Sequence, residues 1–175
     1  MLTADDAAKL SELAITIYKQ YYIHLWHDGG MWYLEYAYPV EKLRRELSDL
    51  NNFHYIAYLE QQAVGYLKLR LNEKWKGLES EHCLEVERIY ILKEFAGSGL
   101  GKKFMEVAVE IAKYHNQDII FLKAMDSSHN ALAFYQKMGF EIFDRLTLPF
   151  EQMKMEYRGM VVMRGFKSLI PDLQI

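Results

Sequence analysis

The sequence predicts a mixed α/β domain in which helices cover both faces of a twisted, mostly antiparallel sheet with one parallel strand pair at its centre. Two observations predict this class. Short apolar runs of strand length alternate along the chain with segments in which apolar residues recur at helical spacing. In addition, an apolar run at 84–92 is followed by a glycine loop, a helical segment at 101–115 and a second apolar run at 119–125. Strands joined through a helix in this way lie parallel, so these two runs should form the parallel pair.

The segments before this unit predict two helices and a hairpin. A capping-box pattern at 3–6 begins the first helix, which should end near residue 22. Segment 23–38 contains a glycine pair and several aromatics and is predicted to be a loop, after which Pro39 opens a second helix. Strand-like runs at 55–59 and 63–71 are separated by a short polar turn and should pair as a hairpin.

The segments after the unit predict one more helix and the last two strands. Polar residues at 126–130 offer N-caps for the helix, and Gly139 should end it. The runs at 140–146 and 160–164 are strand-like. Because no linker, repeat or low-complexity tract interrupts the chain, we expect residues 1–175 to form a single domain.

Composition and charge exclude several classes of function. The formal net charge is −3, so the chain lacks the basic footprint of a nucleic-acid-binding protein. No apolar run is long enough to cross a membrane, and the N-terminus lacks the pattern of a signal peptide, which predicts a cytoplasmic protein. Cys83 is the only cysteine, so the chain has no internal disulfide and no cysteine-based metal cluster, and no other grouping has convincing metal spacing.

The loop after the first strand of the parallel pair reads EFAGSGLGKKF over 94–104, with glycines at three alternate positions. Backbone N–H groups of such a turn, together with the positive end of the following helix, bind anions. Two phosphate loops fit it poorly. A nucleoside-triphosphate loop needs a hydroxyl residue after its lysine, whereas Lys102 is followed by Lys103. A dinucleotide loop needs its third glycine where Lys102 stands.

A third phosphate loop fits much better, and a second motif accompanies it. Residues 96–101, AGSGLG, match the pattern Gln/Arg-x-x-Gly-x-Gly/Ala at every position except the first, which is Ala96. About thirty residues later the chain reads NALAFYQKMGF over 130–140. These two motifs at this separation resemble the acyl-CoA-binding region of the GNAT acetyltransferases, over residues 84–140. Within that superfamily, LEVERIYI and the two motifs look like the PaiA-type polyamine acetyltransferases.

The resemblance implies a GNAT fold, acetyl-CoA as co-substrate and no metal. It implies that the backbone of the strand ending in the loop pairs with the pantetheine arm, and that N–H groups of the loop bind the pyrophosphate. Ala96 replaces a side chain that contacts the pyrophosphate in the family, so we expect coenzyme A binding to be weakened but not lost. The cofactor-binding residues implied are Ile89, Tyr90, Ile91, Ala96, Gly97, Ser98, Gly99, Leu100, Gly101, Lys102, Asn130 and Tyr135.

Three side chains are candidates for the chemistry. A primary amine with a pKa of about 10.4 must lose a proton before it attacks, at a cost of roughly 4.6 kcal/mol at neutral pH. Glu85 and Glu87 should project to the same face of their strand. The family resemblance implies Glu85 as the base acting through water, with Glu87 as the alternative base or as a binder of the acceptor's cation. It also implies Tyr135 as the acid that protonates the leaving thiolate, and Asn130 as a helix cap or a partner of the pantetheine arm.

The resemblance implies an amine acceptor, with spermidine or spermine as the expected substrate. A protein N-terminus or another small amine is the alternative, as is a module that binds acyl-CoA without catalysis. The aromatic residues between Tyr18 and Tyr38 are expected to border the acceptor site, although most of them should serve packing. We expect no nucleic-acid or membrane partner, and the resemblance suggests a homodimer.

Overall fold

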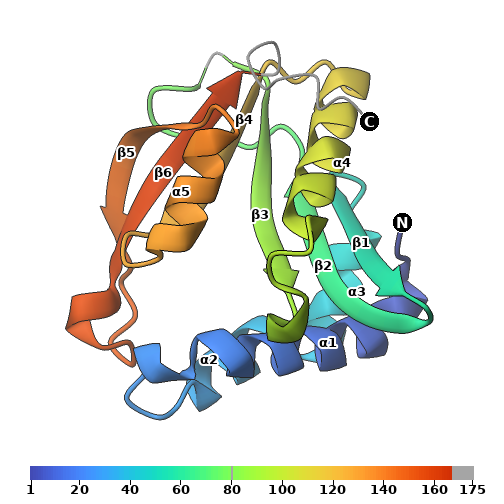
Figure 1. The fold of residues 1–175 in the computed structure, drawn as a ribbon, viewed down its shortest axis with the longest axis vertical. Coiled ribbons are helices and arrows are strands. Elements are labelled where there is room, and N and C mark those ends of the chain that lie inside the picture. The colour runs from blue at the N-terminus through green and yellow to red at the C-terminus, as the bar shows by residue number, and fades with distance from the viewer. Residues whose placement is uncertain (80, 167–175) are drawn as a thin grey trace.

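The computed structural model describes residues 1–79 and 81–166, which form a six-stranded sheet with helices on both faces (Figure 1). The strand order is β1-β2-β3-β4-β6-β5, and β3 with β4 is the parallel pair among antiparallel neighbours. The predicted fold class is therefore confirmed. The strands are β1 (Asn52–Leu59), β2 (Gln62–Arg70), β3 (Cys83–Ile91), β4 (Ile119–Met125), β5 (Glu141–Thr147) and β6 (Gly159–Phe166).

The helices follow the predicted positions with one exception. The α-helices are α1 (Ala7–Tyr21), α2 (Met31–Ala37), α3 (Val40–Ser48), α4 (Leu100–Tyr114) and α5 (His129–Lys137). Short 3₁₀ turns are η1 (Ala4–Asp6), η2 (Ile23–Leu25), η3 (Lys93–Phe95) and η4 (Met155–Tyr157).

The exception is α2, because segment 23–38 was predicted to be a loop and that prediction is wrong for its second half. Gly30 adopts a left-handed conformation with φ 86° and is the N-cap of α2. The Asp28 carboxylate accepts hydrogen bonds from the N–H groups of Gly30 and Trp32, at 2.9 and 2.7 Å. These bonds satisfy donors that a helix start leaves without an intrahelical partner, which is how so short a helix is stabilised here.

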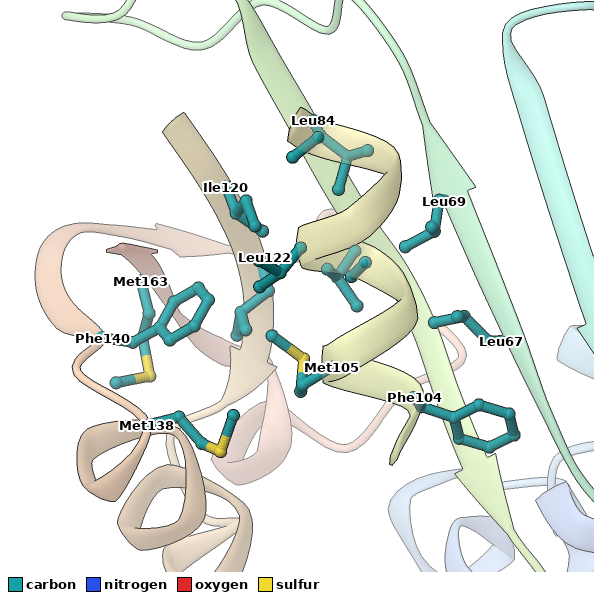
Figure 2. Close-up of a cluster of buried hydrophobic side chains, with 14 of the residues drawn as sticks. Leu67, Leu69, Leu84, Phe104, Met105, Ile120, Leu122, Met138, Phe140 and Met163 are labelled. Atoms are coloured by element: carbon teal, nitrogen blue, oxygen red, sulfur yellow. The ribbon is translucent and has the colours of Figure 1, made fainter. Parts of the chain in front are cut away.

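The two larger of three hydrophobic clusters in the described residues lie on opposite faces of the sheet. The first lies between the sheet and α4, where Met105 is fully buried beside strand residues such as Leu84 and Leu122 (Figure 2). The second lies under α1 and α3 and is rich in aromatic residues, with Tyr38 and Tyr66 almost fully buried. Side chains of one strand reach both cores because strand residues alternate between faces.

The parallel pair separates partway along its length. β3 pairs with β4 only over Cys83–Val86, although β3 continues to Ile91 and β4 to Met125. In Figure 1 the two strands lie side by side at the top of the view and diverge below. The pairing of β3 with β2 also shifts register here, because Lys68 lies opposite Arg88 and Leu69 lies opposite Val86. Glu87 is therefore the extra residue of a β-bulge, a feature that redirects a side chain and bends a strand.

Candidate active site between the diverging strands

The glycine loop connects β3 to α4 and presents unpaired backbone donors. Gly97 and Gly99 have φ values of 81° and 84°, a region that side chains disfavour, and Gly99 is the N-cap of α4. Within the part of the chain that the structure describes, no partner accepts from the N–H groups of Gly97 and of residues 99–102. The Ser98 N–H donates to the Phe95 carbonyl at 3.3 Å, so it differs from the five others predicted to bind phosphate. Free donors at the positive end of a helix are an arrangement that favours an anionic ligand.

A groove of about 600 Å³, which we call the glycine groove, extends from this loop along the free edge of β3. Beyond Val86, the side of β3 that faces β4 has no strand partner in the described chain, so its backbone groups are available to a ligand. Ten of the predicted cofactor-binding residues line the groove, whereas Ser98 and Leu100 face away from it. The ten are Ile89, Tyr90, Ile91, Ala96, Gly97, Gly99, Gly101, Lys102, Asn130 and Tyr135.

A second cavity, the aromatic cavity, has a volume of about 220 Å³ and lies on the other side of the gap between β3 and β4. Four of the aromatics from the N-terminal segment line it, and that they border an acceptor there stays a prediction. They are Tyr18, Tyr22, Trp26 and Tyr33. The glycine groove and the aromatic cavity share part of their walls, so a ligand in one can meet a ligand in the other. The shared residues are Tyr22, Ile89, Tyr90, Ala131 and Tyr135.

The Tyr135 side chain lies at this junction. It comes from α5, is half-buried, and packs against Phe134 and Phe140. Burial raises the pKa of the Tyr135 phenol well above its ordinary value, with a smaller contribution from Tyr22. The phenol therefore keeps its proton at neutral pH, and it can donate that proton to a leaving group but cannot accept one.

Glu87 lines the aromatic cavity, but its charge is already compensated. Its carboxylate lies 2.8 Å from Lys68 Nζ and 3.0 Å from Arg88 Nη2, with Arg70 Nε at 3.6 Å. Burial raises the pKa of Glu87, but Arg88 and Lys68 outweigh it, so that the pKa falls to about 2. A carboxylate with so low a pKa is a poor proton acceptor for an ammonium group.

Glu85 lies deeper in the structure and lines neither cavity. It is 1% exposed, and its carboxylate lies 2.7 Å from Lys123 Nζ and 3.5 Å from Arg70 Nη1. Arg70 contacts both glutamates, which agrees with the prediction that they share a face of β3. The position of Glu85 does not favour direct contact with an acceptor in the aromatic cavity.

Asn130 is exposed in the first turn of α5 and lines the glycine groove. The N-cap of α5 is Ser128, so the predicted capping role of Asn130 is wrong and its side chain is available to a ligand. Sequence reasoning missed several residues that line the groove, among them Ile17 and Tyr21 of α1. No local signal marks them, because α1 reaches the groove only through the packing of the fold.

Three features have no structural basis in the described residues: a metal-binding group, a reactive cysteine and a membrane-spanning helix. Within residues 1–79 and 81–166, no group of histidine, cysteine, aspartate and glutamate side chains could hold a metal ion. Cys83 is buried, and burial raises its pKa to about 11, which makes it a poor nucleophile. None of the helices described is both long and apolar enough to cross a membrane.

Comparison with known proteins places the chain in a family. The model of the acetyltransferase (GNAT) family matches residues 12–140. An uncharacterized N-acetyltransferase from Lactobacillus delbrueckii subsp. lactis is 31% identical over 63% of this chain and 64% of its own length, so the match spans less than two thirds of that relative. The spermine/spermidine N(1)-acetyltransferase of Bacillus subtilis (strain 168) is 24% identical over 58% of this chain and 70% of its length.

The fold also matches a solved structure along nearly its whole length. The PaiA N-acetyltransferase from Thermoplasma acidophilum, crystallised in complex with coenzyme A, has a TM-score of 0.72 to this chain. The alignment covers 94% of this chain and 95% of that chain at 20% sequence identity. This likeness establishes the fold that the two chains share.

Proposed function

This chain belongs to the acetyltransferase (GNAT) family, and we propose that it transfers the acetyl group of acetyl-CoA directly to a primary amine. One observation carries the proposal. The glycine groove and the aromatic cavity meet at Tyr135, so a donor in the groove and an acceptor in the cavity would bring their reacting ends to the same side chain.

The glycine groove fits the donor. The five free N–H groups and the positive end of α4 would bind the pyrophosphate, each bond to a charged acceptor contributing about 1.5–3 kcal/mol. Because several such bonds form together, the loss of one side-chain contact at Ala96 leaves most of this binding intact. The free edge of β3 at residues 89–91 would pair with the pantetheine arm, and Asn130 could hydrogen-bond it.

Acetyl-CoA supplies an activated thioester, and the residues around it position the acceptor and handle protons. Tyr135 would donate its proton to the departing thiolate, and burial of the phenol keeps that proton in place at neutral pH. Neither glutamate is suited to take the proton directly, because Glu85 lines neither cavity and Glu87 has a pKa of about 2. We therefore propose that the ammonium proton leaves through water to solvent, and that Glu87 orients the cationic side chains around it. Lone Cys83 is buried outside both cavities, which supports transfer without a covalent enzyme intermediate.

The acceptor class is the open part of the proposal. A polyamine such as spermidine or spermine is suggested by the name of the Bacillus subtilis relative, and aromatic faces can bind ammonium groups. A protein N-terminus or another small amine would fit the apolar lining equally well. Among the described residues, Glu87 is the one carboxylate that lines the aromatic cavity, and three cations already compensate it.

A thiol-release assay on the pure protein tests the proposal, with acetyl-CoA and a panel of spermidine, octylamine and a peptide with a free N-terminus. We expect turnover with at least one amine and tight binding of acetyl-CoA by calorimetry. Binding without turnover for every amine would instead favour a module that binds acyl-CoA and does not catalyse transfer.

A further inference from the structure

A third cavity continues from the aromatic cavity on the side away from the glycine loop. It has a volume of about 620 Å³. Its walls are formed by side chains from α2, α3 and strands β1 to β4, together with Leu148 and Phe150. We call it the cationic pocket. It shares with the aromatic cavity the residues Tyr33, Glu87, Lys123, Leu148 and Phe150, so the two spaces adjoin.

The charged residues that line the cationic pocket are unequally divided between the two signs. Six are cationic and three are acidic, and two further carboxylates, Glu73 and Glu85, pair with Arg70 from outside the lining. The balance is positive even when both of these are counted, because six cations face five carboxylates. The cations are Lys42, Arg45, Lys68, Arg70, Arg88 and Lys123, and the lining carboxylates are Glu46, Asp49 and Glu87.

Most of these charges compensate one another. Glu46 of α3 lies 2.8 Å from Lys68 Nζ and 3.4 Å from Arg88 Nη1, and Glu87 contacts the same two cations. Asp49 accepts hydrogen bonds from the Asn51 N–H and the Asn52 side-chain amide. Glu46 and Glu87 are therefore paired with cations, which disfavours a second ammonium group beside them. Among the described residues, Asp49 has only these neutral donors as partners, so its single negative charge is set against the cations that remain in the pocket.

Two cations on α3 are not compensated in this way. Neither Lys42 nor Arg45 forms an ion pair with any residue in the described parts of the chain. Lys42 Nζ donates to the Tyr36 carbonyl at 2.9 Å and lies 4.2 Å from the centre of the Tyr36 ring, which leaves donors free. Arg45 is exposed at the mouth of the pocket. An anionic group that entered the pocket would gain both cations as partners.

Resting on the proposed function, we propose that the acceptor is a primary amine whose far end carries a carboxylate or phosphate, bound by Lys42 and Arg45 in the cationic pocket. The amine of this acceptor would lie beside Tyr135, and the apolar chain between its two ends would cross the aromatic cavity. Glu87 and Tyr90 mark the two ends of this path on β3, and three strand residues span about 10 Å. A free α-amino acid is too short to bridge that distance, whereas an ω-amino acid of medium length reaches it.

Three probes of equal length test the charge of the far end. Octylamine has a neutral end, diaminooctane has a cationic end like a polyamine, and aminooctanoate with its amine on the terminal carbon has an anionic end. We expect kcat/KM for aminooctanoate to exceed that for octylamine by about tenfold, and diaminooctane to be the poorest of the three. Added salt should reduce the first difference, because the interaction is partly exposed.

Charge reversal at the mouth tests the site itself. Arg45→Glu should lower kcat/KM for aminooctanoate by about tenfold, chiefly through KM, and leave octylamine nearly unchanged. Arg44→Glu is the matched control, because Arg44 precedes it on the same helix, pairs with Glu41 and does not line the pocket. Both side chains are exposed, so neither variant should impair folding.

The outcomes separate this inference from the proposed function. Turnover of octylamine or diaminooctane with no preference for aminooctanoate, or an equal effect of the Arg44 and Arg45 variants, would overturn the anionic acceptor and leave acetyl transfer standing. A phosphate-ended analogue of the same length distinguishes a carboxylate from a phosphate. Absence of turnover with all probes and with the wider amine panel would overturn the proposed function itself.

Discussion

At the scale of single residues, Tyr135 is the side chain to which both cavities lead. Tyr135→Phe removes the phenolic proton and keeps the ring that packs against Phe134 and Phe140. If the phenol protonates the thiolate, kcat should fall by roughly tenfold or more, while acetyl-CoA affinity stays nearly unchanged. Steady-state kinetics measures kcat, and calorimetry measures the affinity for acetyl-CoA.

Tyr114→Phe is the matched control for that experiment, because Tyr114 is 82% exposed on α4 and lies outside both cavities. It should behave like the natural chain in both assays. A Tyr135→Phe variant that lost donor affinity and turnover in equal proportion would show that Tyr135 has a structural role and does not act as the acid.

The sequence identified Glu85 and Glu87 as neighbours on one face but could not predict their charge state. Arg88 is the next residue in the sequence, but the ion pair of Glu87 with Lys68 comes from the fold, because the two residues are 19 positions apart. The bulge that directs Glu87 also depends on pairing with β2. A single sequence carries no local signal for such contacts, so the proton path had to be inferred from the structure.

At the scale of elements, the glycine loop is the feature most open to a direct test. A Cβ built on Gly99 meets no atom within 4 Å, so a valine there would project into the open groove where the pyrophosphate is proposed to bind. Gly99→Val should therefore weaken acetyl-CoA binding by at least about tenfold, as measured by calorimetry.

Valine at a φ of 84° also strains the backbone, and Gly77→Val controls for that strain. Gly77 has the same φ of 84°, meets no atom within 4 Å and lies in an exposed loop away from the groove. The two variants should lose similar stability, but only Gly99→Val should lose donor affinity. Donor affinity like that of the natural chain in Gly99→Val would contradict the proposed role of the loop.

Most elements were predictable, and the exception has a physical cause. The strands of the parallel pair appear in the sequence as apolar runs, and their observed bounds differ from the predicted ones by one residue or none. Helix α2 was missed because three of its seven residues are aromatic, with modest helix propensity, and because it follows a glycine pair that is typical of loops. Asp28 was the available signal, since an aspartate before a short apolar segment is a frequent capping residue.

At the scale of the whole molecule, His54 couples the stability of the fold to pH. It is 1% exposed in β1, and neither ring nitrogen has a hydrogen-bond partner in the described chain. Burial lowers the pKa of His54 to about 4, with a further contribution from Lys68. Between pH 6.5 and about 4 the unfolded chain binds a proton that the folded chain excludes, so the free energy of unfolding decreases as the pH falls through this window.

His54→Leu should remove this part of the pH dependence. The difference between the free energies of unfolding at pH 7 and pH 4 should shrink by up to about 3 kcal/mol in urea titrations. His82→Leu is the control, because His82 is exposed. An unchanged difference in His54→Leu would mean that the buried imidazole is protonated in the fold.

The single domain and the homodimer stay predictions at this scale.

The divergence of β3 and β4 has a consequence for the order in which reactants bind and products leave. The aromatic cavity shares lining residues with the glycine groove on one side and with the cationic pocket on the other. If the donor and the acceptor bind as proposed, each would enter from its own side and neither would block the exit of the other. Coenzyme A and the acetylated amine could therefore leave in either order. An excess of one substrate should not inhibit the binding of the other.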